Sequence, residues 1–231
     1  MSIYAIGDLH FSGSPPTKPM DIFGDNWDNH REKILAVWQK SVTATDTIIL
    51  CGDTSWAMDL KTAMDNDLTA IVALPGEKIL LKGNHDYWWT SLKKMEKVTE
   101  HNINFLQNNF FTANDVAICG TRGWNLPFGE TFSPEDELIL KRECGRLETS
   151  LKLALGQGYN NIIVGLHYPP LYKNMTESVF TEIMEKYKVQ KCVFGHVHGE
   201  DAGSVFQGEK NGTEYKLVAA DYTNFQLVKL T

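Results

Sequence analysis

The stretch "LLKGNHDYWW", residues 80–89, changes from apolar to polar at Gly83. The apolar run before it predicts a short buried strand. Asn84, His85 and Asp86 then follow together, at the point where that strand would end. In open α/β sheets the carboxyl ends of the strands face one crevice, where ligands bind. We therefore expect these three side chains to serve chemistry rather than packing.

Four other apolar runs end in the same way, with an Asp or a His directly after the last apolar residues. These polar residues are Asp8 and His10 after "IYAIG", Asp53 after "TIILCG", His167 after "NIIVGL", and His196 and His198 after "KCVFG". Of the seven histidines, only His30 and His101 fall elsewhere, in predicted helices. We expect His30 to lie on a helix surface. The strand-end residues, although far apart in the sequence, are predicted to converge at one edge of a sheet.

Apolar runs alternate with amphipathic stretches along the chain, which predicts an α/β fold. The predicted strands are 2–8, 46–52, 78–82, 115–120, 160–166 and 190–195. Three more runs, 204–207, 214–220 and 224–230, have no helix between them and predict an antiparallel meander. The predicted helices are 28–42, 59–72, 89–100, 134–156 and 176–187. For the longest, Ser133 is the expected N-cap, followed by Pro134 and by Asp136 three residues after the cap.

The composition is that of an ordinary globular protein, with 42% hydrophobic and 22% charged residues in 231. A net charge of -7 disfavours a general nucleic-acid binder, although a local basic groove stays open. We find no apolar run long enough to span a membrane and no secretion signal at the N-terminus. The four cysteines form no C-x-x-C pair, and buried reduced thiols suit a cytoplasmic protein.

The strand-end residues form a set of oxygen and nitrogen donors without a thiolate. The set is Asp8, His10, Asp53, Asn84, His167, His196 and His198. Such donors suit Mn, Fe, Zn, Ni or Co. They are too many for one tetrahedral zinc but suit two divalent transition-metal ions that share a carboxylate, either Asp53 or Asp8. Two divalent ions would leave a charge surplus that attracts an anion and lowers the pKa of a bound water molecule.

The five blocks "GDLH", "GDTSW", "GNHDYWW", "GLHYPP" and "GHVHG", in this order, resemble the calcineurin-like metallophosphoesterase superfamily. The resemblance implies a single domain over residues 1–231. Its fold would be an α/β four-layer αββα sandwich of two mixed β-sheets flanked by helices. It implies one metal held by Asp8, His10, Asp53 and His198, and another held by Asp53, Asn84, His167 and His196. Asp53 would be the bridge. His85 would face the substrate as general acid or phosphate binder, and Asp86 would orient it.

The chain departs from the protein Ser/Thr phosphatase branch of that superfamily. "TSWAMDL" follows its second block without the arginine typical of that branch, and its third block ends in Asp86 rather than in glutamate. It looks more like the small bacterial-type phosphohydrolases. We expect hydrolysis of a phosphomonoester or phosphodiester in a small phosphorylated substrate. A metal-bridging hydroxide would attack, and His85 would assist the leaving group.

Two alternatives stay open: a nuclease acting on polynucleotides, and a non-catalytic metal-binding interaction scaffold on the same fold. The acidic balance argues against the first, and the complete set of donors argues against the second. The oligomeric state stays open. Arg122 and Trp124, in "GTRGW", are further candidates for substrate binding. Trp56, Trp88, Trp89 and Trp124 either touch the substrate or pack around the loops, and we favour packing.

Overall fold

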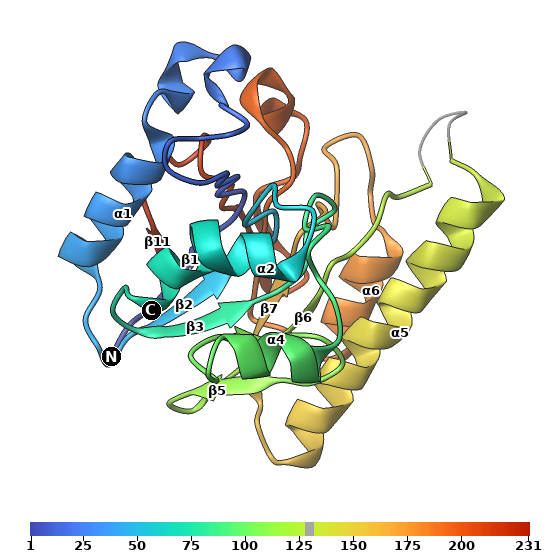
Figure 1. Cartoon of the computed structure of the whole chain (residues 1–231). Coiled ribbons are helices and arrows are strands. Elements are labelled where there is room, and N and C mark those ends of the chain that lie inside the picture. The colour runs from blue at the N-terminus through green and yellow to red at the C-terminus, as the bar shows by residue number, and fades with distance from the viewer. Residues whose placement is uncertain (128–131) are drawn as a thin grey trace.

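Two mixed sheets form the centre of the protein in a computed structural model, which describes residues 1–127 and 132–231 (Figure 1). The first sheet has the order β11-β1-β2-β3-β4, and the second has the order β5-β6-β7-β8-β10-β9. The first consists of β1 (Ile3–Ile6), β2 (Thr47–Leu50), β3 (Glu77–Leu80), β4 (Asn104–Phe105) and β11 (Val228–Lys229). The second consists of β5 (Phe111–Ala113), β6 (Val116–Thr121), β7 (Asn161–Leu166), β8 (Lys191–Phe194), β9 (Gly208–Lys210) and β10 (Thr213–Leu217).

The helices flank the two sheets. They are α1 (His30–Ser41), α2 (Leu60–Ala63), α3 (Thr69–Val72), α4 (Leu92–Val98), α5 (Pro134–Gly156) and α6 (Val179–Lys186). A π-helical turn, Met64–Leu68, joins α2 to α3, so the predicted helix 59–72 is interrupted. Short 3-10 segments lie at Asp21–Phe23 (η1), Asp25–Trp27 (η2) and Gly199–Gly203 (η4). None of the helices in the described part of the chain has the length and hydropathy needed to cross a membrane.

Alternating side chains of the central strands supply different apolar layers. Ile48 and Leu50 of β2 lie in one cluster with Ile34 and Trp38 of α1, whereas Ile49 lies in the layer between the two sheets. β2 is therefore buried on both faces, which explains why its sequence is apolar throughout instead of alternating.

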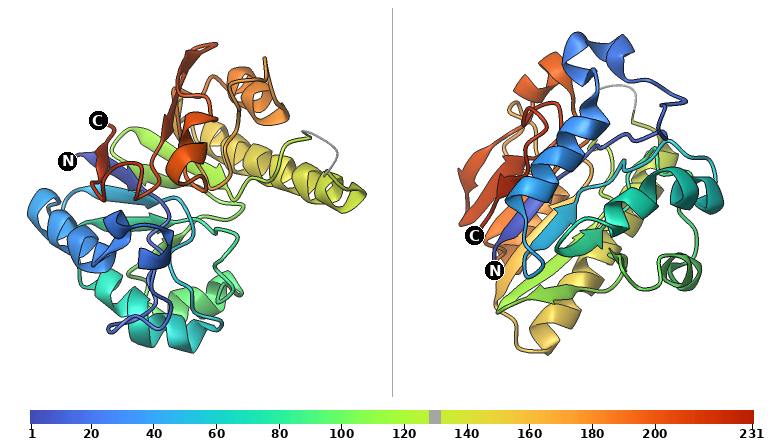
Figure 2. Two further views of the ribbon diagram at one scale, coloured as in Figure 1. Left: turned by 90° about the horizontal axis from the view of Figure 1, so that it is seen from above. Right: turned by 60° about the vertical axis from the view of Figure 1, so that its left-hand side comes forward.

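The second sheet is covered on its outer face by α5 and α6 (Figures 1 and 2). Leu147 and Leu151 of α5 and Phe180 of α6 share a cluster with Val164 of β7. The α5 helix begins as predicted, because Ser133 and Asp136 form a reciprocal capping box with Pro134 in the first turn. The order helices, sheet, sheet, helices confirms the predicted four-layer αββα sandwich.

The predicted antiparallel meander at the end of the chain is wrong. β9 and β10 form an antiparallel pair, but the next neighbour of β10 is β8, with which it pairs in parallel. β11 crosses to the other sheet and pairs with β1. Residues 204–207 form no strand, and Val205 makes only an isolated bridge to Tyr172. The short apolar runs in this part of the sequence indicate strands, but the pairing partner of each strand depends on the packing of the whole molecule.

Candidate metal centre

The candidate residues follow five parallel strands whose carboxyl ends lie at one edge of the sandwich. β1, β2 and β3 are mutually parallel in the first sheet, and β7 and β8 are parallel in the second. The first sheet delivers Asp8, His10, Asp53, Asn84 and His85, and the second delivers His167, His196 and His198. The structure brings the seven predicted donors into one cluster, in which each side chain lies within 4 Å of another.

Several of these residues have left-handed backbone angles, which non-glycine residues rarely adopt. The φ angles are 58° at Asp8, 47° at His10, 50° at Asp53 and 77° at His196. Each costs conformational free energy and persists only where the surrounding structure enforces it. Four such residues in one cluster indicate that the strand ends are shaped to aim side chains, at the expense of stability.

Two glycines allow the close approach of the carboxylates. A Cβ atom at Gly195 would overlap Oδ2 of Asp8, and one at Gly83 would overlap Oδ1 of Asp53. Any larger residue at these positions of the "GNHD" and "GHVH" blocks would collide with a carboxylate. The two glycines are therefore needed for space and not for an unusual backbone angle.

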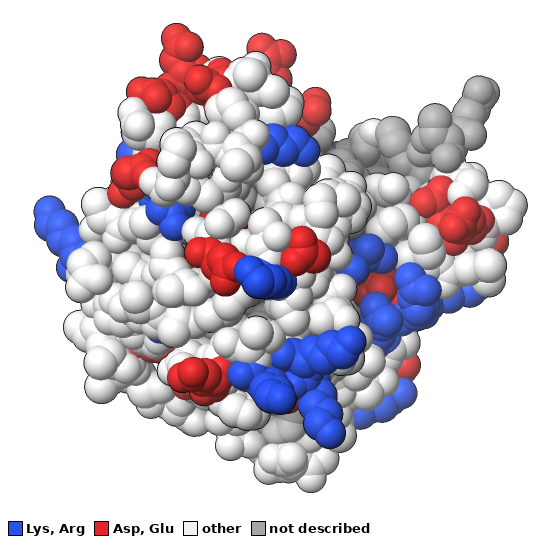
Figure 3. All heavy atoms as spheres, in the orientation of Figure 1, with Lys and Arg blue, Asp and Glu red and all other residues white. Residues whose placement is uncertain are grey.

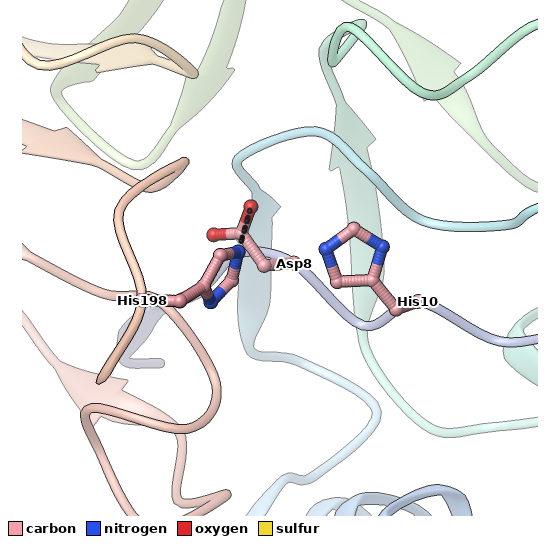
Figure 4. A group of neighbouring side chains, drawn as sticks. All are labelled: Asp8, His10 and His198. Atoms are coloured by element: carbon pink, nitrogen blue, oxygen red, sulfur yellow. Dashed lines mark ion pairs between the residues drawn. The ribbon is translucent and has the colours of Figure 1, made fainter. Parts of the chain in front are cut away.

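Asp8, His10 and His198 form one half of the cluster (Figure 4). Their ligand atoms lie within 4.8 Å of one another, and Nε2 of His198 is 3.7 Å from Oδ1 of Asp8. Asp8 is fully buried, and both of its oxygens accept the backbone N–H of His196 at 3.0–3.1 Å. Two imidazoles and one carboxylate in this arrangement could hold a metal ion.

Asp221 also belongs to this half, although the sequence analysis did not select it. Its Oδ1 accepts a hydrogen bond from Nδ1 of His198 at 2.9 Å, which directs the other nitrogen toward Asp8. Burial lowers the pKa of His198, but the hydrogen bond to Asp221 and the nearby carboxylates outweigh it and raise the pKa to about 9. Asp221 follows the predicted strand 214–220, so the rule that selected the other residues would have found it.

Asn84, His167 and His196 form the other half. Oδ1 of Asn84 lies 2.6 Å from Nε2 of His167 and 3.0 Å from Nδ1 of His196. The two ring nitrogens are 3.2 Å apart. These contacts join the loop after β3 of the first sheet to the loops after β7 and β8 of the second.

The protonation of His167 shows that this half has the character of a cation site. Its Nδ1 lies 2.9 Å from the carbonyl oxygen of Cys51, which can only accept, so Nδ1 carries the proton. Nε2 is then a lone-pair acceptor, and it faces the amide oxygen assigned to Asn84. Two acceptors at this distance repel each other, and a cation bound between them would remove that repulsion. The donors present therefore fit a metal ion.

Asp53 lies between the two halves. Its Oδ2 is 3.9 Å from Nε2 of His10 and 3.5 Å from Nε2 of His167. A second group of possible metal-binding residues in the structure consists of Asp8, Asp53 and His167. Both carboxylates thus lie within reach of His167.

Burial dominates the electrostatics of the cluster. It raises the pKa of Asp53 to about 6 and that of Asp8 well above its usual range. It also lowers the pKa of His167 to about 3 and that of His196 to about 2. The two imidazoles are therefore neutral, which is the form in which they bind metals.

Asp86 does not orient His85, contrary to the sequence-based expectation. Its two oxygens accept the backbone N–H groups of Asp53, Thr54, Ser55 and Gly83 and the indole N–H of Trp88, at distances of 2.8–3.3 Å. The carboxylate is fully buried and holds the loop after β2 against the loop after β3. The adjacent position in the sequence suggested a contact that the backbone conformation directs elsewhere.

His85 is held by aromatic packing and by its backbone. Its ring centroid lies 4.4 Å from that of Trp56 and 6.1 Å from that of Tyr87. Its backbone N–H donates to Oδ1 of Asp53 at 2.7 Å. Burial lowers the pKa of the His85 ring. The ring faces the same pocket as His10, Asp53 and His198.

The four tryptophans predicted to surround the site have different surroundings. Trp88 is buried and bonded to Asp86, and Trp89 donates to Gln107, so both pack as favoured. Trp56 stacks on His10 at 4.8 Å, and Trp124 donates to Asp136. Trp56 therefore reaches the site, whereas Trp88 and Trp89 do not line its pocket.

Arg122 lies beside His167. Its carbonyl oxygen accepts a hydrogen bond from the backbone N–H of His167 at 3.0 Å. Its guanidinium lies over the ring of Trp124, with Cζ 4.3 Å from the centroid, and Nη2 is 3.7 Å from Oε1 of Glu143. The buried Nε of Arg122 has no hydrogen-bond partner among the described residues. Burial raises the pKa of Asp53 and lowers that of His167, and the charge of Arg122 is a smaller cause that lowers both.

His30 is buried rather than on the helix surface. Its ring nitrogens lie 3.1 Å from the carbonyl oxygen of Trp27 and 3.3 Å from that of His10. Trp27, which the sequence analysis did not select, is itself buried and lies edge-on to the rings of His10 and His198. The local sequence around a histidine in an amphipathic helix does not show whether its side chain lies on the exposed or on the buried face.

Residues 1–200 match the sequence family described as calcineurin-like phosphoesterase. The chain belongs to this family. The match includes every block that carried the resemblance and all seven donors, which agrees with the metal-binding character of the cluster. A comparison with curated proteins finds no significant match.

Solved structures also resemble this calcineurin-like phosphoesterase. TT1561 of Thermus thermophilus has 13% identity and a TM-score of 0.57, and the match covers 99% of this chain and 97% of the other. AQ665 from Aquifex aeolicus, a protein of unknown function, has 18% identity and a TM-score of 0.53, with 99% and 95% coverage. At these identities the likeness supports the fold alone.

Proposed function

We propose that this chain is a metal-dependent hydrolase of phosphomonoesters or phosphodiesters in small molecules. The observation that carries the proposal is the convergence of Asn84, His167 and His196, in which the amide oxygen of Asn84 lies 2.6 Å from the unprotonated Nε2 of His167 and 3.0 Å from Nδ1 of His196. A cation between the amide oxygen and this ring nitrogen would make the contact favourable. Membership of the phosphoesterase family supplies the class of reaction.

Two divalent ions suit the two halves of the cluster. One set of ligands would be Asp8, His10, Asp53 and His198, and the other would be Asp53, Asn84, His167 and His196. Asp53 is the shared ligand in this assignment, because its Oδ2 faces imidazoles of both sets. When bound, such ions would polarise the phosphoryl group and lower the pKa of a water molecule.

His85 would donate a proton or hydrogen bond to the leaving oxygen. It lines the pocket beside the candidate ligands, and it is the one histidine there that the proposed ligand sets leave free. Arg122 would add positive charge near the phosphate, because its Nε has no partner among the described residues and its charge acts on Asp53.

The proposal is tested by metal analysis combined with an activity screen. The chain is loaded with Mn, Ni, Co or Zn and assayed with p-nitrophenyl phosphate and with bis-(p-nitrophenyl) phosphate. We expect two bound ions per chain and hydrolysis of at least one ester. A metal-loaded chain that hydrolyses neither ester would contradict the proposal. The ratio of the two rates assigns the monoesterase or diesterase preference.

A further inference from the structure

The pocket above the candidate metal centre has a polar floor and an apolar wall. It has a volume of about 440 Å³, within the size range of small-molecule sites. The floor consists of His10, Asp53, His85, His196, His198 and Asp221. The wall consists of Met20, Phe23, Trp27 and Trp56, three of which come from the segment between β1 and α1. A phosphate on the floor would therefore direct the rest of the substrate toward aromatic side chains.

His85 fixes which part of the substrate meets this wall. Under the proposed function it contacts the leaving oxygen, and its ring lies 4.4 Å from that of Trp56. Tyr87 adjoins it on the solvent side, with 55% of its surface exposed. The group that departs with the leaving oxygen is consequently the part of the substrate surrounded by aromatic side chains.

Several exposed apolar side chains belong to the segments that line the pocket. Ten large apolar residues are exposed in the described part of the chain. Five of them lie in the pocket wall or within two residues of a pocket-lining residue: Ile22, Phe23, Met58, Tyr87 and Tyr222. Phe23 lines the pocket itself while 66% of its surface is exposed. Single exposed apolar residues are ordinary, but a large aromatic side chain exposed within a pocket lining is suited to contact a ligand.

The charges around the same opening are mostly negative. Asp21, Asp25, Asp28, Glu200 and Asp201 are exposed and lie within two residues of a pocket-lining residue, where Lys18 is the one Lys or Arg. Figure 3 shows acidic side chains gathered over this end of the molecule, where η1, η2 and η4 lie in Figure 1. The ammonium of Lys18 lies over the outer face of Trp56, 3.4 Å from the ring centroid. A leaving group with further phosphates would be repelled here.

We propose that the preferred substrate carries an uncharged, flat aromatic ring on its leaving group, and that Phe23 is a specificity-determining residue which contacts that ring. This inference rests on the proposed function, because the phosphate must lie on the metal-binding floor. The acidic residues near the opening disfavour a polynucleotide or polyphosphate leaving group. An apolar group without a flat ring is the alternative that the experiment separates.

The test uses phosphonates, which bind as phosphate esters do but are not hydrolysed. Methylphosphonate, benzylphosphonate and cyclohexylmethylphosphonate are titrated calorimetrically into the Mn-loaded protein. We expect benzylphosphonate to bind about tenfold more tightly than methylphosphonate, which corresponds to partial burial of one ring. Cyclohexylmethylphosphonate should bind more weakly than the benzyl compound. Equal binding of these two, or equal binding of all three, overturns the inference.

The variant Phe23→Ala assigns the effect to the wall. We expect it to lose most of the preference for benzylphosphonate and to keep its affinity for methylphosphonate. Leu138→Ala is the matched control, because Leu138 is 69% exposed on α5, outside the pocket lining. A benzyl preference that survives Phe23→Ala contradicts the role of this residue. If no phosphonate binds and no phosphate ester is hydrolysed, the proposed function fails together with the inference. If esters are hydrolysed but the benzyl preference is absent, the inference alone fails.

Discussion

The histidines at the strand ends differ in what holds the ring nitrogen that faces away from the cluster. In His198 this nitrogen donates to the carboxylate of Asp221, and in His167 it donates to the carbonyl oxygen of Cys51. The buried Nδ1 of His85 has no partner in the described structure. Fixed tautomers suit metal ligands. Nδ1 of His10, a proposed ligand, also has no partner among the described residues, so the fixed tautomers support His167 and His198 as ligands but do not by themselves set His85 apart.

Substitution of Asp221 should weaken metal binding without removing it. In Asp221→Asn the charge that strengthens His198 as a ligand is lost, and we expect metal affinity to fall about tenfold. Titration of the metal-free protein with Mn²⁺ measures the change. Activity should return at saturating metal. Glu200→Gln removes a nearby exposed charge and serves as the control; an equal loss in both variants would assign the effect to general electrostatics.

Substitution of His85 should separate metal binding from turnover. We expect His85→Ala to retain its metal while kcat falls about a hundredfold to ten-thousandfold, the range of general acid-base catalysis. Metal analysis and steady-state kinetics provide the two readouts. His101→Ala, at an exposed histidine outside the cluster, should match the wild type. Full turnover by His85→Ala on its best substrate would remove His85 from the mechanism.

At the scale of elements, the loops after β2 and β3 act as one unit because Asp86 binds both. In Asp86→Asn one oxygen is replaced by an NH₂ group that faces buried N–H donors. We expect the free energy of unfolding to fall by about 3 kcal/mol. Urea denaturation measures it, with Asp65→Asn on the helical surface as the control. Unchanged stability with reduced turnover would restore the catalytic role first expected for Asp86.

The elements that the sequence predicted well are those whose signal is local. α5 has its capping box and its apolar stripe within one stretch, and its bounds match the prediction, 134–156. The strands that end in polar residues were also found, because each is buried on both faces. β4 and β5 were missed, since runs of two or three residues, Asn104–Phe105 and Phe111–Ala113, are too short to show a pattern.

At the scale of the whole molecule, the sequence predicted which residues meet but not how the end of the chain closes the fold. β11 pairs with β1, more than 220 residues away in sequence, and no local feature of Val228 or Lys229 indicates that partner. The strand-end rule could have selected Asp221, but its contact with His198 across the cluster could not be predicted from the sequence. Convergence could be predicted because parallel strands share an edge. Specific contacts between loops required the packing of the two sheets.

The candidate metal centre joins the two sheets, so metal binding should stabilise the whole fold. Asp8, Asp53 and Asn84 follow strands of the first sheet. Of the imidazole ligands, all but His10 follow strands of the second sheet. An ion that binds only when both are in place stabilises the native state by about 2.7 kcal/mol at a concentration one hundred times its Kd. For a chain of this size, that raises Tm by roughly 5–10 °C.

Thermal unfolding with and without Mn²⁺ measures this shift, and a chelator should reverse it. Asp53→Asn is the decisive companion variant, because Asp53 is the one carboxylate whose Oδ2 faces His10 and His167 together. If Asp53 is shared, this variant should lose both ions and show no metal-dependent rise in Tm. A variant that still binds two ions and is stabilised as much as the wild type would show that the halves of the cluster are independent, and Asp8 would then be the residue that links them to His167.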